Sequence, residues 1–182
     1  MIFPEETYTL NGKTILLRSA TDEDAQMLID YLKTVSGETR FLLRDPDEIN
    51  IPLERERAFI QKRNAAPEEL MLLAFVDGEY AGNCSFEGLV GRRRSAHRAD
   101  VAIALYQKYT GFGLGRLMLE RLLRLVREKG YEQAELTVNA ENARAMRLYE
   151  RLGFRAVGRF PRASKYADGS YADEIFMVLD LR

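Results

Sequence analysis

The sequence predicts a single mixed α/β domain, and three patterns lead to that prediction. Short apolar or alternating runs, typical of strands, occur in turn with segments of helical period. Asn11-Gly12 and Asp77-Gly78 each join two strand-like runs and are hairpin signals. A glycine-rich turn, Gly111–Gly115, joins an apolar strand to a long amphipathic helix. Such strand-to-helix turns are where α/β domains tend to bind ligands.

In the first half of the chain, the local signals predict a hairpin, two helices and a second hairpin. Thr21 suits a helix N-cap, with Asp24 at the third helical position. Pro52 suits the first turn of the second helix. The expected elements are strands at 8–10 and 14–18, helices at 21–35 and 53–64, and strands at 70–76 and 79–87.

In the second half, a strand, helix, strand and short helix lead to a last pair of strands. Lys129-Gly130 is a good end for the long helix. Asn139 or Asn142 caps the short helix, and Gly153 stops it. The expected elements are a strand at 100–106, a helix at 114–129, a strand at 131–138, a helix to about 152, and strands at 154–160 and 173–181.

Composition excludes several classes of protein. With 182 residues there is enough chain for one domain over residues 1–182. The 27 Lys and Arg balance 28 Asp and Glu, so we expect neither nucleic acid nor membrane as a partner. One Cys and one His argue against a structural zinc site, so we expect no metal. No apolar run approaches the ~20 residues that span a bilayer, and Met1–Leu10 lacks a signal pattern, so we expect a cytoplasmic protein.

Two charged loops are open to more than one interpretation. The connection at 37–52 holds Asp45-Pro46-Asp47-Glu48, which fits either a solvated link or a flap over a cationic substrate. The loop at 88–97 holds Arg92-Arg93-Arg94, which fits solvated surface or a contact with an anionic cofactor or acidic partner. The aromatic interleaving of a nucleic-acid patch is missing there.

The glycine-rich turn predicts an anion site. Its three glycines stand at every second position, so backbone N–H groups can face a ligand, and the helix N-terminus adds roughly half a positive charge. A P-loop would need Gly-Lys-Ser/Thr where Leu114-Gly115-Arg116 stands, which disfavours a nucleotide kinase. The dinucleotide pattern fails in both frames, at Arg116 and Met118. A phosphate or pyrophosphate site and a tight turn without ligand are the alternatives.

Two stretches resemble signatures of the GCN5-related N-acetyltransferase (GNAT) family. Val101–Leu105 followed by Gly111–Gly115 looks like the acetyl-coenzyme A loop of that family. Leu136–Phe154 looks like its second signature, and the resemblance covers about 13–182. It implies one acetyltransferase domain with a mostly antiparallel sheet of six to seven strands and about four helices. The second signature has family spacing at Asn142, Ala145, Tyr149, Gly153 and Phe154.

The resemblance implies acetyl-coenzyme A as cosubstrate and assigns its contacts. Ile103, Ala104 and Leu105 would pair through their backbone with pantetheine, as an added strand pairs with a sheet edge. Asn142 would bind the pantetheine or phosphate arm, or act only as the N-cap. The remaining implied cofactor-binding residues are Thr110, Gly111, Phe112, Gly113, Leu114, Gly115, Arg116, Ala145 and Tyr149.

One residue of the loop departs from the family pattern. The family usually has Arg or Gln where this chain has Thr110, which brings a hydroxyl but no charge. We therefore expect weaker cofactor affinity with the same ligand. Arg116 or the arginines at 92–94 are the hypothetical sources of the missing charge.

Acetyl transfer needs a neutral amine, a polarised carbonyl and protonation of the leaving thiolate. The resemblance implies that Tyr149 meets the cofactor sulfur as general acid; the alternative is a packed core tyrosine. A phenol of pKa about 10 and a thiol of pKa about 8.5 make full proton transfer uphill by roughly 2 kcal/mol. Tyr149 is therefore expected mainly to orient and hydrogen-bond the sulfur.

The general base is less well marked. Family enzymes that acetylate ribosomal protein N-termini have a Glu at the position of Thr137, which argues against that substrate. We assign Glu87, acting through water, because the resemblance places its strand beside the acceptor cleft. Cys84 has no nearby His on its strand and is expected to be a buried small residue, not an acyl nucleophile. The other candidate bases are Asp100, Asp173 and Glu174.

We therefore expect an acetyl-coenzyme A-dependent N-acetyltransferase that acts by direct transfer on a primary amine of a small molecule or amino acid. A peptide or protein amine is the runner-up acceptor. A non-catalytic coenzyme A-binding sensor module is the alternative from another class. Members of the family are often dimers, so a homodimer stays open.

Overall fold

The computed structural model describes residues 1–91 and 93–182, and these form two compact units. Unit 1 contains residues 1–87 and 102–122, and unit 2 contains residues 88–101 and 123–182. Strand β5 (Arg98–Leu105) and helix α3 (Leu114–Glu128) contribute residues to both units. The expectation of one domain over the whole chain stays a prediction.

Two hairpins supply the antiparallel strands of unit 1. The first joins β1 (Glu6–Leu10) to β2 (Lys13–Ser19), and the second joins β3 (Glu69–Val76) to β4 (Glu79–Gly88). Both two-residue turns have positive φ at both positions, from 51° to 87°, which is the geometry that Asn-Gly and Asp-Gly favour. Both predicted hairpins are therefore confirmed.

Two helices of unit 1 follow the predicted order. The 3₁₀ turn η1 (Asp22–Asp24) leads into α1 (Ala25–Glu38), and α2 (Leu53–Ala65) follows η2 (Pro46–Glu48). The predicted pair of Thr21 and Asp24 forms a capping box. Helix α1 runs three residues beyond the predicted 35 and includes Gly37; it ends before Thr39, which is extended.

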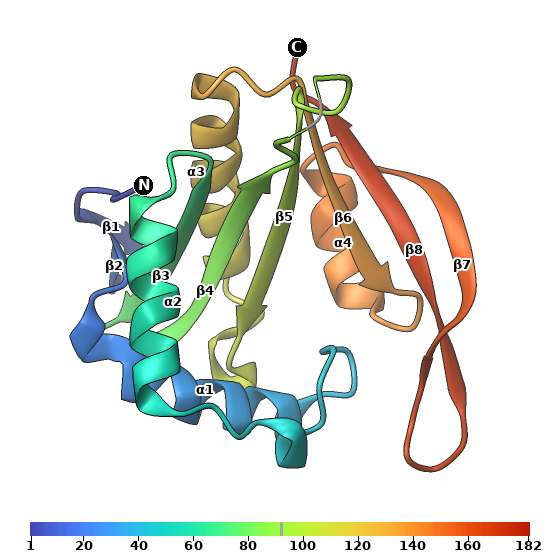
Figure 1. Cartoon of the computed structure of the whole chain (residues 1–182), viewed down its shortest axis with the longest axis horizontal. Helices are drawn as coiled ribbons and strands as arrows, with labels where there is room; N and C mark the ends of the chain where they lie inside the picture. The colour runs from blue at the N-terminus through green and yellow to red at the C-terminus, as the bar shows by residue number, and fades with distance from the viewer. Residues whose placement is uncertain (92) are drawn as a thin grey trace. The chain divides into compact units, whose positions relative to one another are not determined.

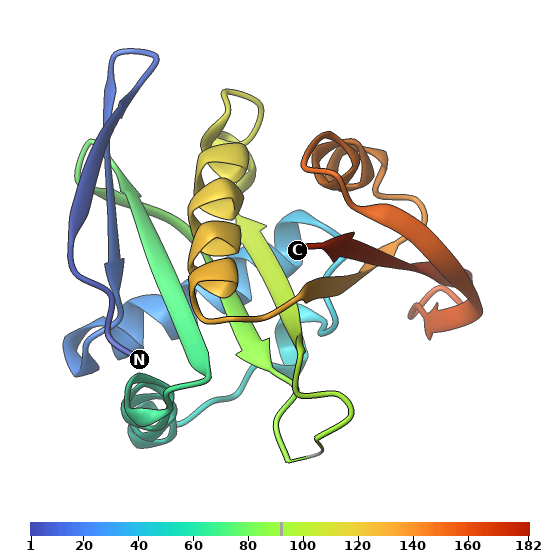
Figure 2. The same ribbon diagram turned by 90° about the horizontal axis from the view of Figure 1, so that it is seen from above.

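Helices cover both faces of the strands of unit 1 (Figures 1 and 2). On one face, Tyr31 of α1 and Ile60 of α2 share a core cluster with Met71 and Leu73 of β3. On the other face, the Sγ of Cys84 on β4 lies 3.9 Å from the Met118 carbonyl oxygen of α3. The alternation of β4 therefore directs Cys84 to α3 and its odd-numbered neighbours to the α1 and α2 side.

Unit 2 is built on β5, β6 (Gln133–Asn139), β8 (Tyr171–Asp180) and β7 (Arg155–Lys165). Arg98–Asp100 of β5 pair with β6 in parallel, and the β6–β8 and β8–β7 pairs are antiparallel. Helix α4 (Ala143–Arg151) joins β6 to β7. Figure 1 shows the long β7–β8 hairpin at the end of the chain.

Among the described residues, eight strands form one sheet, in the order β1-β2-β3-β4-β5-β6-β8-β7, and there are four α-helices. The predicted fold class is confirmed, but the predicted count of six to seven strands is wrong. Strand β7 also runs to Lys165 instead of ending at Phe160. Pro161 suggests a strand end, yet a register shift between Phe160 and Ser164 lets the pairing resume beyond it.

Candidate active site

The glycine-rich loop of unit 1 has the backbone geometry of an anion site. Gly111 and Gly113 have φ of +92° and +102°, a region that L side chains rarely adopt. A Cβ added to Gly111 would meet nothing within 4 Å, so backbone conformation, not packing, demands glycine there. The Leu117 amide donates to the Gly113 carbonyl at 3.1 Å. The preceding amides, 114–116, have no intrahelical acceptor and are free to bind an anion.

The β1–β2 hairpin supports this loop. Nδ2 of Asn11 donates to the Phe112 carbonyl at 2.9 Å. A Cβ on Gly113 would stand 3.7 Å from Cδ1 of Leu10, so the hairpin tip also packs beside the loop. The Asn11-Gly12 pattern predicts only a turn at Asn11. Its contact 101 positions along the chain has no local signal.

Thr110 and Arg116 both bind within the chain. The Thr110 hydroxyl donates to the Gln107 carbonyl at 2.8 Å, across the 3₁₀ turn η3 (Gln107–Tyr109). Nε of Arg116 donates to Oε1 of Glu120 at 2.7 Å, in a solvent-exposed ion pair one helical turn apart. Arg93 and Arg94 are exposed, whereas Arg92 of the predicted arginine loop lies outside the described residues.

The predicted pantetheine strand continues beyond the β6 pairing into unit 1. Ile103, Ala104 and Leu105 are partly exposed there. Gly82 of β4 lies so close that an added Cβ would stand 2.3 Å from the Ala104 carbonyl oxygen and 2.7 Å from Cα of Leu105. No residue larger than glycine fits at position 82, so this segment of β5 requires Gly82 beside it. No local sequence pattern predicts this, because the close approach joins two distant segments.

In unit 2, Asn142 and not Asn139 is the N-cap of α4. Oδ1 of Asn142 accepts from the Ala145 amide at 3.1 Å, and Nδ2 has no bond to any described residue. That amide group stays available as a donor to a ligand. Asn139 is buried and holds the preceding turn: it donates to the Tyr166 hydroxyl at 2.7 Å and accepts from the Glu141 amide at 2.9 Å.

Tyr149 lies on the buried face of α4. Its side chain is 7% exposed, and its ring packs edge-on against Phe154 with 5.8 Å between centroids. Burial raises the pKa of Tyr149 to about 12, because the phenolate is the form that loses hydration. The hydroxyl therefore stays protonated and is a hydrogen-bond donor at any physiological pH.

The candidate bases differ in their surroundings. Glu87, the next-to-last residue of β4, has its side chain 63% exposed and Oε2 3.9 Å from Nη2 of Arg63. Asp173 is held charged, because the Arg162 amide at 2.8 Å and Nε of Arg159 at 2.6 Å lower its pKa. Asp100 on β5 is exposed, and Glu174 on β8 is half-buried. Asp173 is therefore a poor proton acceptor.

Cys84 is fully buried on β4, as expected of a packing residue. Burial raises the pKa of its thiol, so the nucleophilic thiolate is disfavoured. Among the described residues, no group of three His, Cys, Asp or Glu side chains could hold a metal ion. Within residues 1–91 and 93–182, no helix is long and apolar enough to cross a membrane.

The model of the acetyltransferase (GNAT) family matches residues 28–154. The chain belongs to this family. It is accordingly an acyltransferase. A GNAT acetyltransferase from Streptococcus pneumoniae has the same fold, with a TM-score of 0.85 and 31% identity over 91% of this chain and 99% of that one.

Two further relatives are more distant. The YncA acetyltransferase of Salmonella typhimurium, solved with its cofactor acetyl-coenzyme A, matches with a TM-score of 0.80 and 21% identity over 92% of this chain and 94% of that one. The L-amino acid N-acetyltransferase AaaT of Escherichia coli K12 is 24% identical over 133 residues, which cover 71% of this chain and 80% of AaaT. The likeness to YncA concerns the fold alone.

Proposed function

We propose that this acetyltransferase moves the acetyl group of acetyl-coenzyme A directly to a primary amine of a small molecule or amino acid. The geometry of the glycine loop supports this most: left-handed Gly111 and Gly113 precede the unbonded amides of the first turn of α3. Those amides, with Thr110, Phe112 and Arg116 beside them, would bind the pyrophosphate. The amino acid acceptor is favoured by the relative AaaT.

The remaining residues of the chain have separate functions in this proposal. The backbone of Ile103, Ala104 and Leu105 pairs with the pantetheine arm. Nδ2 of Asn142 donates to the same arm, at the end of α4 where Ala145 leaves room for it. Tyr149 donates its hydroxyl hydrogen bond to the thioester sulfur and so stabilises the charge that develops there. Glu87 is the first candidate to accept the amine's proton through water.

The thiol released from acetyl-coenzyme A, measured with DTNB, tests the proposal. The acceptors are the twenty L-amino acids, putrescine and a lysine-containing peptide, each at saturating concentration. We expect release that depends on a free amino acid or diamine. Release with the peptide alone would reassign the acceptor to peptides or proteins. Tight binding of acetyl-coenzyme A by calorimetry, with no release for any amine, would favour a non-catalytic sensor module.

A further inference from the structure

Helix α2 carries a largely buried glutamate that is not among the predicted site residues. Glu56 is 6% exposed, whereas Glu54 on the same helix is exposed. In the described chain, the Glu56 carboxylate has no hydrogen bond and no ion pair. The carboxylate oxygens of Glu56 are not among the fully buried polar atoms without a partner in the described chain, so they reach solvent and are open to a ligand of opposite charge.

The face of α2 that carries Glu56 is directed at the sheet. Leu53, Glu56, Ile60 and Arg63 follow one another at helical spacing along one side of the helix. Ile60 belongs to the core cluster with Tyr31 of α1, and Leu53 packs against that cluster. Glu56 stands between these two apolar contacts and therefore faces the interior of unit 1.

The position of Glu56 along the sheet follows from Arg63. The Arg63 guanidinium lies 3.4 Å from Glu69, where β3 starts, and 3.9 Å from Glu87, near the end of β4. Figure 1 shows α2 and β4 running in the same direction. Glu56 precedes Arg63 by about two helical turns, or roughly 10 Å, which equals about three residues of strand. Glu56 is thus level with residues 83–85 of β4.

Polar side chains of β4 occupy that level on the same side of the sheet. Asn83 and Ser85 alternate with Cys84, which points to α3, so both are directed toward α1 and α2. Both are half-buried, and Nδ2 of Asn83 donates to the Tyr80 hydroxyl at 2.9 Å. Gly82, which borders the proposed pantetheine strand at Ala104, is the next residue along β4.

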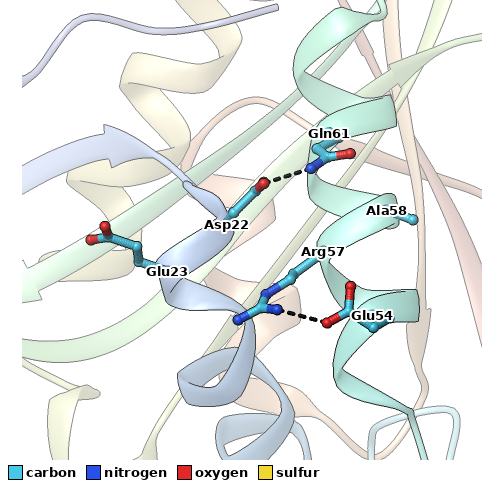
Figure 3. Close-up of a pocket in the computed structure, with 6 residues that line it drawn as sticks. All are labelled: Asp22, Glu23, Glu54, Arg57, Ala58 and Gln61. Atoms are coloured by element: carbon cyan, nitrogen blue, oxygen red, sulfur yellow. Dashed lines mark hydrogen bonds and ion pairs between the residues drawn. The ribbon is translucent and has the colours of Figure 1, made fainter.

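The outer side of α2, in contrast, carries polar side chains that already have partners. There, a surface hollow of about 430 Å³ is lined by Asp22, Glu23, Glu54, Arg57, Ala58 and Gln61. Figure 3 shows that Asp22 bonds to Gln61, and that Glu54 bonds to Arg57. These polar groups satisfy one another, so nothing in the hollow requires a ligand.

We propose that Glu56 binds the ammonium group of the acceptor and takes its proton. This rests on the proposed N-acetyltransferase function. The ammonium loses one proton to the Glu56 carboxylate, which releases it to solvent. The nitrogen lone pair then forms a bond to the acetyl carbon, the carbon–sulfur bond breaks, and the second nitrogen proton goes to the leaving sulfur. Amide, free thiol and one released proton balance the reaction.

Among the described residues, the titratable groups near Glu56 are neutral or lie beside an opposite charge, so Glu56 takes the place of Glu87 as the acceptor of that proton. Asp24 is bonded to Arg18, Glu69 and Glu87 lie near Arg63, and Arg57 is paired with Glu54. Burial raises the pKa of Tyr31 and Tyr80, which keeps both phenols neutral. Burial likewise raises the pKa of Glu56, which makes the carboxylate a better base.

The variants Glu56→Gln and Glu54→Gln test the proposal with the same change on the two sides of one helix. We expect Glu56→Gln to lower kcat/KM for the best amine of the panel by about 100-fold or more, and to weaken calorimetric binding of that amine to the coenzyme A-loaded enzyme. The affinity for acetyl-coenzyme A stays unchanged in both variants. Glu54→Gln stays within twofold of the wild type. The acid limb of the kcat–pH profile disappears only in Glu56→Gln.

Three other outcomes overturn the proposal in distinguishable ways. If Glu56→Gln matches Glu54→Gln in rate and amine binding, Glu56 has no part in catalysis, while the proposed function stands. If Glu87→Gln removes the acid limb and Glu56→Gln keeps it, the base is Glu87. If the wild type binds acetyl-coenzyme A but acetylates no amine of the panel, the proposed function fails and this inference fails with it. Thermal melting of each variant shows that the compared proteins are folded.

Discussion

The hydroxyl of Tyr149 is a donor that gives up its proton with difficulty. Its pKa of about 12 exceeds that of a thiol near 8.5, so complete transfer to the leaving sulfur is uphill by about 5 kcal/mol. A hydrogen bond to a charged group contributes about 1.5–3 kcal/mol. Tyr149→Phe should therefore lower kcat by roughly 10- to 100-fold and leave acetyl-coenzyme A affinity unchanged. Thiol release and calorimetry measure the two quantities, and undiminished turnover would exclude contact with the sulfur.

Gly111 permits a separate test of the anion site. An alanine there must keep φ near +92°, at a cost of about 1–2 kcal/mol, although its Cβ has room. We expect Gly111→Ala to weaken acetyl-coenzyme A binding by about tenfold, because the loop relaxes away from this conformation. Gly130→Ala is the matched control, since Gly130 has φ of +87° and equal space but follows α3. Equal affinities in the two variants would contradict an anion site at the loop.

Single residues also mark the limit of what could be predicted. The glycine turn was readable, because its conformation depends on neighbours in sequence. The burial of Glu56 was not predictable, because Glu56 stands in the charged run Leu53–Arg57, in which the sequence predicts that every carboxylate faces solvent. Only the packing of α2 against α1 and β3 decides that Glu56 is buried and Glu54 exposed.

At the scale of elements, α4 combines a cap with a ligand contact in one residue. Asn142→Ala removes the bond to the Ala145 amide and should cost about 1 kcal/mol of stability. Asn142→Asp keeps an oxygen acceptor at the cap but loses the Nδ2 donor. We expect the Asp variant to keep wild-type stability and to bind acetyl-coenzyme A several-fold more weakly. Urea denaturation and calorimetry separate the effects, and unchanged cofactor affinity in both variants would leave Asn142 as a cap only.

The elements themselves were predictable where local chemistry determines them. Asn11-Gly12 and Asp77-Gly78 favour the hairpin conformation on their own, and Thr21 with Asp24 starts a helix on its own. The continuation of β7 past Pro161 was missed, because it depends on pairing with β8. The contact of Asn11 with the glycine loop was missed for the same reason: it joins elements far apart in the sequence.

At the scale of the whole molecule, the stability of the fold should depend on pH through two largely buried carboxyl groups, Asp24 and Glu56, whose pKa values shift in opposite directions on folding. Burial acts to raise the pKa of Asp24, but the Arg18 guanidinium, at 2.6 and 2.7 Å, and the Thr21 amide outweigh it and lower that pKa. The folded state thus favours the carboxylate. Its contribution is present above the unfolded pKa near 4 and is lost as pH falls through the folded pKa. Asp24→Asn should cost about 1.5–3 kcal/mol at pH 7, and progressively less below pH 4, in urea titrations.

Glu56 has the reverse dependence, because burial raises its folded pKa and nothing in the described chain compensates its charge. Below the unfolded pKa near 4.3 both states are protonated, and no penalty exists. As pH rises, the folded state must ionise a buried group, so the penalty grows until pH exceeds the folded pKa. Glu56→Gln should therefore be more stable than the wild type at pH 7, and equal to it near pH 4. Glu54→Gln should show no such difference.

A stabilised Glu56→Gln that has also lost amine acetylation would mean that the fold tolerates an unpaired carboxylate because the acceptor's ammonium compensates it. A variant of unchanged stability at both pH values would show that the carboxylate is solvated after all.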